Sequence, residues 1–439
     1  MSYWQQQPKQ RKLLLLLVAI SFSAAFYKAM HHPTPATFVV PVNDQHVGAQ
    51  RAIIRSHFVS PTQNISTHAA SLVDLGNGYI RAFWFAGSRE GAKDVQIRTA
   101  VFDPVYDRWS PETAIADRNS TQNGLLRFVK KIGNPVAHQA SDGTLWLFYV
   151  TVSIGGWAGS SITAMTSHDD GNTWSGARRL ITSPFINIST LVKGTPFNYS
   201  DGSIGLPIYH EFIGKFGELL RLSSSGEVID KQRLTSGKLA IQPVPLILDA
   251  QRALMLMRHT GAAPKRVISA VTTDAGQHWS TPQKIALSNP DAAVAGVALA
   301  DGRLLAVLND TEAKREVLSL VVSSDNGKNW ETVLQLEDQH GQHPQPAEYV
   351  RLATQLAKDT EATLVDASAF GASARHNKCM GQSCEFEFSY PYLIQAKNSD
   401  FHLVYTWNRS HIKHVSFSRK WLDQRITELR KEVSDAAVH

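Results

Sequence analysis

The sequence predicts an all-β protein, a six-bladed β-propeller with four strands in each blade. One turn motif occurs three times, weaker copies of it fall between these, and strand-like runs fill most of the chain. The motif is Ser/Thr-x-Asp-x-Gly-x-x-Trp, and its copies are SHDDGNTW at 167–174, TTDAGQHW at 272–279 and SSDNGKNW at 323–330. A repeated period on strand-rich sequence is typical of propeller blades.

Each copy of the motif has the residues of a tight turn between two strands. Asp169, Asp274 and Asp325 can accept hydrogen bonds from backbone N–H groups, the glycine two residues later allows a positive φ, and the tryptophan packs the turn onto a sheet. The aspartates lie 105 and then 51 residues apart. The period is therefore about fifty residues, with one degenerate copy in the longer interval.

Degenerate copies occur where this period requires them. FDPVYDRWS at 102–110 retains an aspartate and Trp109, and LSSSGEVID at 222–230 retains Gly226. The predicted blades are 60–118, 124–182, 188–235, 238–288, 291–338 and 347–421. Strand-like runs within them include TLWLFYVTV, ALMLMR, RLLAVL, LSLVVS and FHLVYTW. Helix signals are nearly absent before a charged stretch at 422–437.

Composition indicates one large globular unit over residues 60–421. Hydrophobic residues make up 43% of the 439 residues, which is enough for a buried core. The net charge of +6 is spread along the chain, without a basic helix or an aromatic-basic motif. We therefore expect no nucleic-acid partner.

The N-terminus has the order of an export signal. Lys9, Arg11 and Lys12 precede the apolar run LLLLLVAISFSAAFY at 13–27. Residues 1–30 are predicted to be a signal peptide or a membrane anchor, which would place the protein in the periplasm, free or anchored to the inner membrane. Residues 31–59 would then form a tether and 422–439 a helical tail. An intracellular scaffold propeller is the alternative.

The two cysteines, Cys379 and Cys384, lie in CMGQSC. In an oxidising compartment such a pair can close a small disulfide loop, and in a reducing one it remains two thiols. His376 is close, but no further cluster supplies four metal ligands. We expect a disulfide, no metal and no organic cofactor.

Several segments, together with the repeated turns, resemble the BNR/Asp-box sialidases, and in particular a divergent branch of them. These segments are AFWFAGSREGAKDVQI at 82–97, GNPVAH at 133–138, LMRHTG at 256–261 and EFSYPYLIQ at 387–395. The resemblance covers roughly residues 60–420. It implies hydrolysis of a terminal α-ketosidic bond of an acidic 2-keto sugar, with retention of configuration and with no metal.

The resemblance also implies roles for single residues. Arg258 and Arg315 match two arginines that bind the sugar carboxylate, for which the guanidinium fork is well suited. Tyr390 matches the tyrosine nucleophile, which the family uses because the substrate's negative charge repels a carboxylate. Packing of an aromatic ring between blades is the alternative interpretation of Tyr390.

The chain departs from the family pattern at two positions. The first strand of the family contains Arg-Ile-Pro, whereas His68 stands at the arginine position here, and Arg89 is a second candidate for the missing cation. The tyrosine's glutamate partner is replaced by Gln242, which leaves Glu211 or Glu387 as substitutes. A rim salt bridge with the neighbouring glutamate is the alternative interpretation of Arg89.

The catalytic acid is expected in the loop after the first-strand cation. Glu90 and Asp94 are the carboxylates there, and burial beside apolar residues would raise the pKa of one of them into a range useful for proton donation. Asp94 is the preferred candidate, and a turn residue at a strand start is its alternative interpretation.

The sequence as a whole predicts an exported exo-glycosidase that acts on an acidic-sugar glycoconjugate. The sugar would be sialic acid or a related ulosonic acid such as Kdo, and the N-terminal segment would contact a membrane. An accessory protein is a further possible partner. The alternative is a catalytically inactive propeller that binds a glycan or a partner protein, because loss of one arginine and one glutamate is what such decay would produce.

Overall fold

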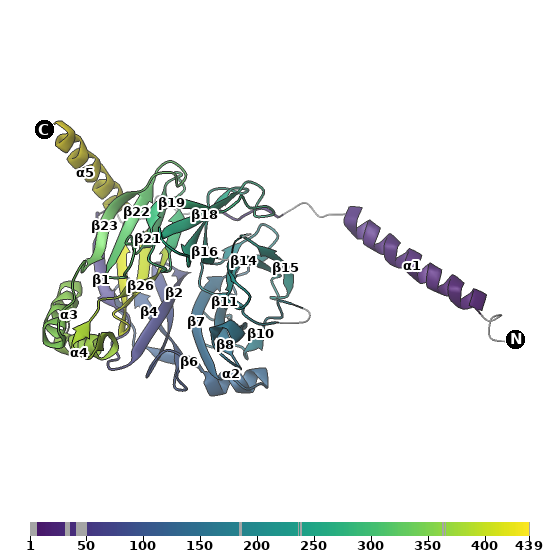
Figure 1. Ribbon diagram of the computed structural model, residues 1–439, viewed down its shortest axis with the longest axis horizontal. Coiled ribbons are helices and arrows are strands. Elements are labelled where there is room, and N and C mark those ends of the chain that lie inside the picture. The colour runs from purple at the N-terminus through teal and green to yellow at the C-terminus, as the bar shows by residue number, and fades with distance from the viewer. Residues whose placement is uncertain are drawn as a thin grey trace.

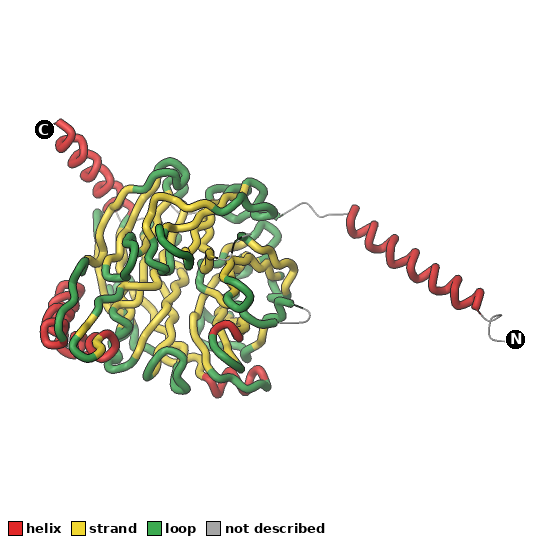
Figure 2. The backbone as a smooth tube through the Cα atoms, in the orientation of Figure 1, coloured by secondary structure: helices red, strands yellow, loops and turns green. Residues whose placement is uncertain are grey.

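The structure is a computed structural model that describes residues 7–30, 36–40, 51–183, 187–235, 237, 239–361, 364 and 366–438. Strands form most of the body, with helices at its edges (Figures 1 and 2). Residues 31–35 and 41–50 of the predicted tether lie outside the described residues.

The three predicted aspartate turns form, and each joins two antiparallel strands. In the first copy the Asp169 carboxylate accepts a hydrogen bond from the backbone N–H of Thr173 at 2.8 Å. Gly171 has a φ of 87°, and the Trp174 indole N–H donates to the Gly171 carbonyl at 3.0 Å. The other two copies repeat the carboxylate contacts. The turn chemistry predicted from the motif is confirmed.

Five sheets of four or more strands build the body. One has the order β2-β3-β4-β5 with β6 paired to β4; its strands are β2 (Ser66–Gly76), β3 (Tyr79–Gly87), β4 (Gln96–Asp103), β5 (Arg108–Trp109) and β6 (Thr113–Asp117). The next contains β7 (Lys131–Gln139), β8 (Leu145–Val152), β9 (Ser160–Ser167) and β10 (Arg178–Arg179). Another contains β20 (Ala295–Ala298), β21 (Leu304–Leu308), β22 (Val317–Ser323) and β23 (Glu331–Asp338).

A nine-stranded sheet consists of two antiparallel groups. The first group is β11 (Leu191–Val192), β12 (Phe197–Asn198), β13 (Ile204–His210), β14 (Lys215–Leu222) and β15 (Val228–Arg233). The second is β16 (Leu239–Ile247), β17 (Ala253–His259), β18 (Arg266–Thr272) and β19 (Gln283–Ser288). Within the described residues, the strand pairing that joins the groups is a short parallel one of β14 with β16, which involves two residues of each strand. The closed ring of six blades stays a prediction.

The remaining large sheet combines the two ends of the body. Its order is β1-β28-β27-β26, with β1 (Ile54–Phe58), β26 (Phe388–Gln395), β27 (Phe401–Trp407) and β28 (His411–Phe417). The β1 strand pairs antiparallel with β28, so that Ile54 faces Phe417. The prediction that the body begins at residue 60 is therefore wrong, because an earlier strand with little apolar alternation completes this sheet.

Helices are more frequent than the sequence predicted. They are α1 (Gln7–Met30), α2 (Arg118–Leu125), a short 3₁₀ turn (Trp157–Gly159), α3 (Pro346–Thr360), α4 (Ala367–Lys378) and α5 (Arg419–Val438). The predicted blade at 347–421 therefore begins with two helices, which pack against the sheet of β26–β28. Helix-start signals were present: Pro346 opens α3, and Asp366 caps α4 by accepting from the Ala369 N–H at 3.1 Å. No helix among the described residues is long and apolar enough to cross a membrane.

The expected disulfide is present between Cys379 and Cys384. It joins β24 (Cys379–Met380) to β25 (Ser383–Cys384), the small hairpin that follows α4. Cys384 is fully buried, so the link ties the helical insertion, which consists of α3 and α4, to the body directly before β26.

Apolar residues of neighbouring sheets form the core. Trp84 in β3, Phe148 in β8 and Leu206 in β13 are fully buried and belong to one apolar cluster. Consecutive sheets along the chain therefore pack face to face. This packing places β2 next to β7 and β26, and β20 next to β16 and β26. These neighbouring strands position the site described below.

We expect Trp330→Ala to lower the free energy of unfolding by about 3 kcal/mol, because the half-buried indole packs on the core and donates to the Gly327 carbonyl at 3.0 Å. Trp330→Phe, which retains most of the apolar contact, should cost less. Urea denaturation checks both values. A loss below about 0.5 kcal/mol for the alanine variant would show that this turn does not secure the sheet.

Candidate functional site

The first strands of four strand groups contain the same backbone irregularity. Ala69 in β2, Asn134 in β7, Gln242 in β16 and Tyr390 in β26 each have a positive φ, at points where the pairing register shifts. Positive φ is uncommon outside glycine, and a bulge of this kind redirects a side chain. Four residues at matching positions are therefore turned out of the regular strand pattern.

The two other groups show a related feature. Ser189 and Asp291, also with positive φ, lie shortly before β11 and β20. The sequence contains a signal for part of this pattern, since a proline follows the irregular residue in β7, β16 and β26. Proline cannot donate to the strand ladder, so it favours a break there.

Two of these redirected side chains meet at the predicted nucleophile. The Gln242 amide N–H lies 3.3 Å from the Tyr390 phenol oxygen and 3.4 Å from that of Tyr209. Arg258 at the end of β17 places one guanidinium nitrogen 3.5 Å from the Tyr390 oxygen and 3.3 Å from the Gln242 carbonyl oxygen. Two other residues predicted from the sequence, Gln242 and Arg258, thus contact the Tyr390 phenol oxygen.

Arg258 is held in place by Asp291, which it contacts at 2.6 Å. Burial by itself would lower the pKa of Arg258, but Tyr390 and Asp291 raise that pKa above its usual value. The same backbone turn holds a second predicted arginine, because Arg315 donates to the Asp291 carbonyl at 2.6 Å. The Asp291 turn therefore fixes both arginines.

Glu387 connects three cations near this point. It lies 2.8 Å from Lys378, 3.0 Å from Arg409 and 3.6 Å from Arg315, and it accepts from the Ser389 hydroxyl at 2.8 Å. Burial by itself would raise the pKa of Glu387, but Arg409 and Lys378 hold it well below its usual range. Glu387 is thus a charged partner for the arginines, which does not favour its predicted role beside the tyrosine.

Arg409 is the cation that the sequence reasoning missed. It follows β27, and both Asn408 and Arg409 have positive φ. Its guanidinium bridges Glu387 and, at 2.7 Å, Glu90. The only sequence signal was an arginine in the hairpin NRSH, which resembles many surface turns.

His68, which stands at the position of the family's first-strand arginine, lies beside the tyrosine. The two rings have centroids 4.2 Å apart, and the His68 Nδ1 is 3.0 Å from the Thr406 hydroxyl. Burial, reinforced by nearby Arg409, lowers the pKa of His68 well below its usual value. The lowered pKa favours the neutral form of His68, which does not favour its predicted role in place of the first-strand arginine.

The sequence model of the BNR repeat-like domain matches residues 78–403 of the chain. The chain belongs to the BNR repeat-like family. No curated protein sequence matches it.

Solved structures share the fold at low sequence identity. A Hadza microbial sialidase superposes with a TM-score of 0.59 at 14% identity, covering 81% of this chain and 66% of the sialidase. A Dyadobacter fermentans protein of unknown function gives 0.61 at 12% identity, covering 84% of this chain and 98% of that protein. The intramolecular trans-sialidase of Ruminococcus gnavus, in complex with oseltamivir carboxylate, gives 0.55 at 11% identity, with 83% and 96% covered. This BNR repeat-like chain therefore has a sialidase-like, mostly β fold.

The loop between β3 and β4 carries the three remaining first-sheet candidates. Glu90 pairs with Arg409 and accepts from the Trp157 indole at 3.2 Å, so its partner is not the adjacent Arg89, which is exposed. Asp94 is exposed and accepts two hydrogen bonds from Ser88. Partial desolvation would raise the pKa of Asp94, but the Ser88 hydrogen bonds lower it. The expectation of a raised pKa at Asp94 is therefore wrong.

Glu211 is the predicted carboxylate that has the raised pKa. It follows β13, and its backbone N–H donates to the Ser189 hydroxyl at 2.8 Å. Burial raises the pKa of Glu211, an effect that Lys215 and Arg258 only partly offset.

A buried lysine lies under the tyrosine. Lys193 is 3% exposed, donates to the Pro391 carbonyl at 3.0 Å, and lies 5.8 Å from the Tyr390 ring centroid and 5.1 Å from that of Tyr392. Burial lowers its pKa to about 7. A single lysine between apolar residues and a glycine gives no sequence signal, so this residue was missed.

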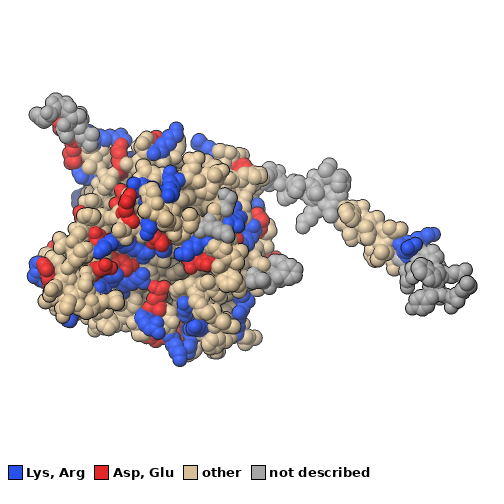
Figure 3. Space-filling model, in the orientation of Figure 1, with Lys and Arg blue, Asp and Glu red and all other residues tan. Residues whose placement is uncertain are grey.

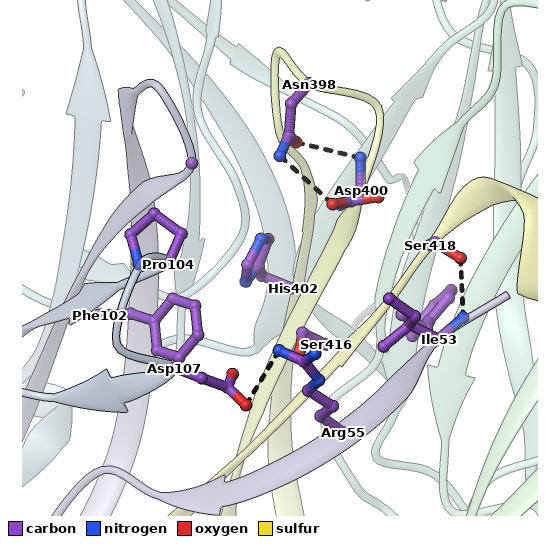
Figure 4. Close-up of a pocket in the computed structure, with 12 residues that line it drawn as sticks. Ile53, Arg55, Phe102, Pro104, Asp107, Asn398, Asp400, His402, Ser416 and Ser418 are labelled. Atoms are coloured by element: carbon purple, nitrogen blue, oxygen red, sulfur yellow. Dashed lines mark hydrogen bonds and ion pairs between the residues drawn. The ribbon is translucent and has the colours of Figure 1, made fainter. Parts of the chain in front are cut away.

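Two cavities lie away from these residues. One of about 190 Å³ lies where β1 and β28 meet the β2–β6 sheet; Figure 4 shows Arg55 and Asp107 paired at its edge, with Phe102 and His402 beside them. The other, of about 780 Å³, includes Trp109 and Phe370 in its lining. Neither is lined by a residue of the tyrosine and arginine cluster.

We expect Lys193→Met to raise the free energy of unfolding at pH 7 by about 3 kcal/mol, since it removes a buried group whose charged form is disfavoured. Lys193 titrates near 7 when folded and near its ordinary value of 10.5 when unfolded. The free energy of unfolding of the parent should therefore decrease as pH falls from about 10.5 to about 7, and that of the Lys193→Met variant should not show this decrease. Urea titrations across that range measure it, with exposed Lys328→Met as control. Parallel curves for the Lys193→Met variant and the parent would contradict the assignment.

Proposed function

We propose that this protein is an exo-acting glycosidase of the sialidase type, which cleaves a terminal α-ketosidic bond of an acidic 2-keto sugar. One observation carries the proposal: the Tyr390 phenol oxygen is contacted by Gln242, the redirected residue of β16, and by Arg258 at the end of β17. Arg315 and Arg409 join this cluster through Glu387. A tyrosine held among arginines suits a substrate whose anomeric carbon bears a carboxylate.

We further propose that the strand groups are six blades of a closed propeller. The four sheets with four or five strands and the two halves of the nine-stranded sheet support this count. The irregular residue at the start of each group supports a common centre. In that arrangement the positive-φ residues face the central axis and form the floor of the site.

The arginines would hold the sugar carboxylate. Arg258 offers the guanidinium nearest to Tyr390, and Arg315 and Arg409 add positive charge from the neighbouring groups. Guanidinium forks bind carboxylates through paired hydrogen bonds, and each such contact is lost when geometry changes. Sialic acid and ulosonic acids such as Kdo share this carboxylate, so both belong to the proposed substrate class.

Tyr390 would attack the anomeric carbon, forming a covalent glycosyl-enzyme that water then hydrolyses with overall retention. The glycosidic oxygen leaves with a proton from a carboxylic acid. Glu211 suits this role better than Asp94 or Glu90, because burial raises the pKa of Glu211. As Tyr390 attacks, its phenol proton would pass to solvent water, since the Gln242 amide cannot accept it. Arg258 would stabilise the negative charge that develops on the phenol oxygen.

One observation favours a second function, binding of an acidic glycan without turnover. Gln242 occupies the place at which the resembled family has a glutamate, and it contacts the phenol through its amide N–H. Without a base at this position Tyr390 is a weaker nucleophile. Turnover of a soluble substrate decides between hydrolysis and binding.

We also propose that residues 1–30 direct export, as the basic and then apolar order of the sequence suggests. Export would expose the protein to oxidising conditions, in agreement with the Cys379–Cys384 disulfide. Fractionation of cells that express the chain with and without residues 1–28 tests this location.

Arg258→Lys and Arg315→Lys should each lower kcat/KM about 30- to 1,000-fold, because lysine keeps the charge but loses the paired geometry. The assay measures free 2-keto acid released from a panel of sialosides and lipopolysaccharide cores. Arg221→Lys, at the Asp201 ion pair away from the cluster, is the matched control and should be unchanged. Wild-type rates for both Arg258→Lys and Arg315→Lys would refute the carboxylate clamp.

Tyr390→Phe should abolish turnover and leave the affinity for a carboxylate-bearing 2-keto sugar within about threefold, because it removes only the nucleophilic oxygen. Calorimetric titration of the free sugar acid measures the affinity. If the parent binds the acid without turnover, the binding function is correct. Normal turnover by Tyr390→Phe would exclude the tyrosine mechanism.

A further inference from the structure

Exposed apolar side chains concentrate in four loops beside the site. Outside α1, nine described large apolar residues are at least 60% exposed; they are Val105, Tyr106, Leu126, Phe128, Ile154, Ile181, Phe212, Ile213 and Met380. Six of these belong to the loops before β7, between β8 and β9, after β10 and between β13 and β14. We call these six the apolar rim: Leu126, Phe128, Ile154, Ile181, Phe212 and Ile213.

The four loops touch one another and continue into the site. The Lys130 ammonium donates to the Gly155 carbonyl at 3.2 Å, which joins the first loop to the second. The Ser160 hydroxyl donates to the Thr190 carbonyl at 3.2 Å, and the Glu211 N–H donates to Ser189, which joins the second to the third and the third to the fourth. Glu211 belongs to the fourth loop, so the apolar rim borders the candidate site directly.

The backbone holds one of these side chains in solvent at a cost. Leu126 caps α2 with a φ of 48° and is 92% exposed. Glycine or asparagine is favoured at such a left-handed position, since a branched apolar residue there is strained. Neither packing nor helix capping accounts for a leucine at this point.

The loops around the apolar rim are basic. Segments 118–131, 153–159 and 178–190 contain no Asp or Glu, and their six basic residues are Arg118, Arg127, Lys130, Lys131, Arg178 and Arg179. The fourth loop, 211–215, adds one acidic and one basic residue. Figure 3 shows Lys and Arg predominating at the lower edge of the body, where Figure 1 places α2.

We propose that this face docks on an anionic lipid surface. Single exposed apolar side chains on loops, three of which contain no Asp or Glu, match an interface of acyl chains below negatively charged head groups. Given the proposed function, docking would bring the site to acidic sugars carried on lipid head groups. The substrate is then a membrane-borne glycolipid.

A local probe tests the docking of the full chain. Among the described residues all cysteines are in the disulfide, so Ile213→Cys can be labelled with an environment-sensitive fluorophore. Vesicles of phosphatidylglycerol should shift its emission to the blue, and lipids brominated in the acyl chain should quench it; phosphatidylcholine alone should do neither. Tyr106→Cys, on the turn between β4 and β5, is the control and should not respond. Because the probe is local, binding through α1 alone gives no signal at residue 213.

The absence of a response at residue 213 overturns the docking proposal, and so does an equal response at residue 106. If the partner of this face is an acidic protein, vesicles of pure lipid leave the emission of the label unchanged. That outcome also overturns the proposal.

Paired substitutions separate docking from catalysis. Leu126→Ser with Phe128→Ser, and Arg127→Glu with Lys130→Glu, should each weaken binding to phosphatidylglycerol vesicles at least about tenfold. Both pairs should retain hydrolysis of a soluble acidic glycoside and lose hydrolysis of a lipid-linked one. Val105→Ser with Tyr106→Ser is the matched control and should change neither. If the parent hydrolyses no glycoside but still inserts residue 213, the enzymatic function fails and docking stands; unchanged vesicle binding by both pairs overturns docking.

Discussion

The buried carboxylate of Glu387 is the constraint on which the arrangement of the site depends. Three cations from different parts of the chain, Arg315, Lys378 and Arg409, converge on it. Without this carboxylate they would repel one another in a desolvated place, and a buried unpaired charge is costly. The ion cluster also ties the helical insertion, through Lys378, to the strand that carries Tyr390. The same pairing limits which guanidinium atoms are available to a ligand.

The fold could be predicted well because its signals are local. Each aspartate turn contains its acceptor, its glycine and its tryptophan within eight residues, so short stretches such as SHDDGNTW at 167–174 were sufficient. The runs predicted as strands, such as FHLVYTW and ALMLMR, form β27 and β17. The helices of the insertion were missed because strand-rich context outweighed the capping signals at Pro346 and Asp366.

The site was predicted only in part, because its geometry depends on contacts across the chain. Tyr390, Gln242 and Arg258 were identified, and they do meet. Arg409 and Lys193 were not, since a turn arginine and a lone lysine acquire meaning only when distant strands surround them. The pKa of Asp94 was expected to rise through burial, yet this loop residue remains in solvent, where its hydrogen bonds dominate. Sequence shows which residue types are available, whereas burial sets their charge.

The pairing of β1 with β28 has a consequence for how the protein is made. The sheet that carries Tyr390 needs residues 54–58 from the start of the body and residues 411–417 from its end. During synthesis the first strand must wait unpaired until nearly the whole chain has left the ribosome. Contacts this distant in sequence form slowly, and unpaired edges are prone to aggregation. The sheet that carries Tyr390 is therefore the last to be completed, and a nascent chain that stops before residue 411 has every aspartate turn but an unfinished candidate site.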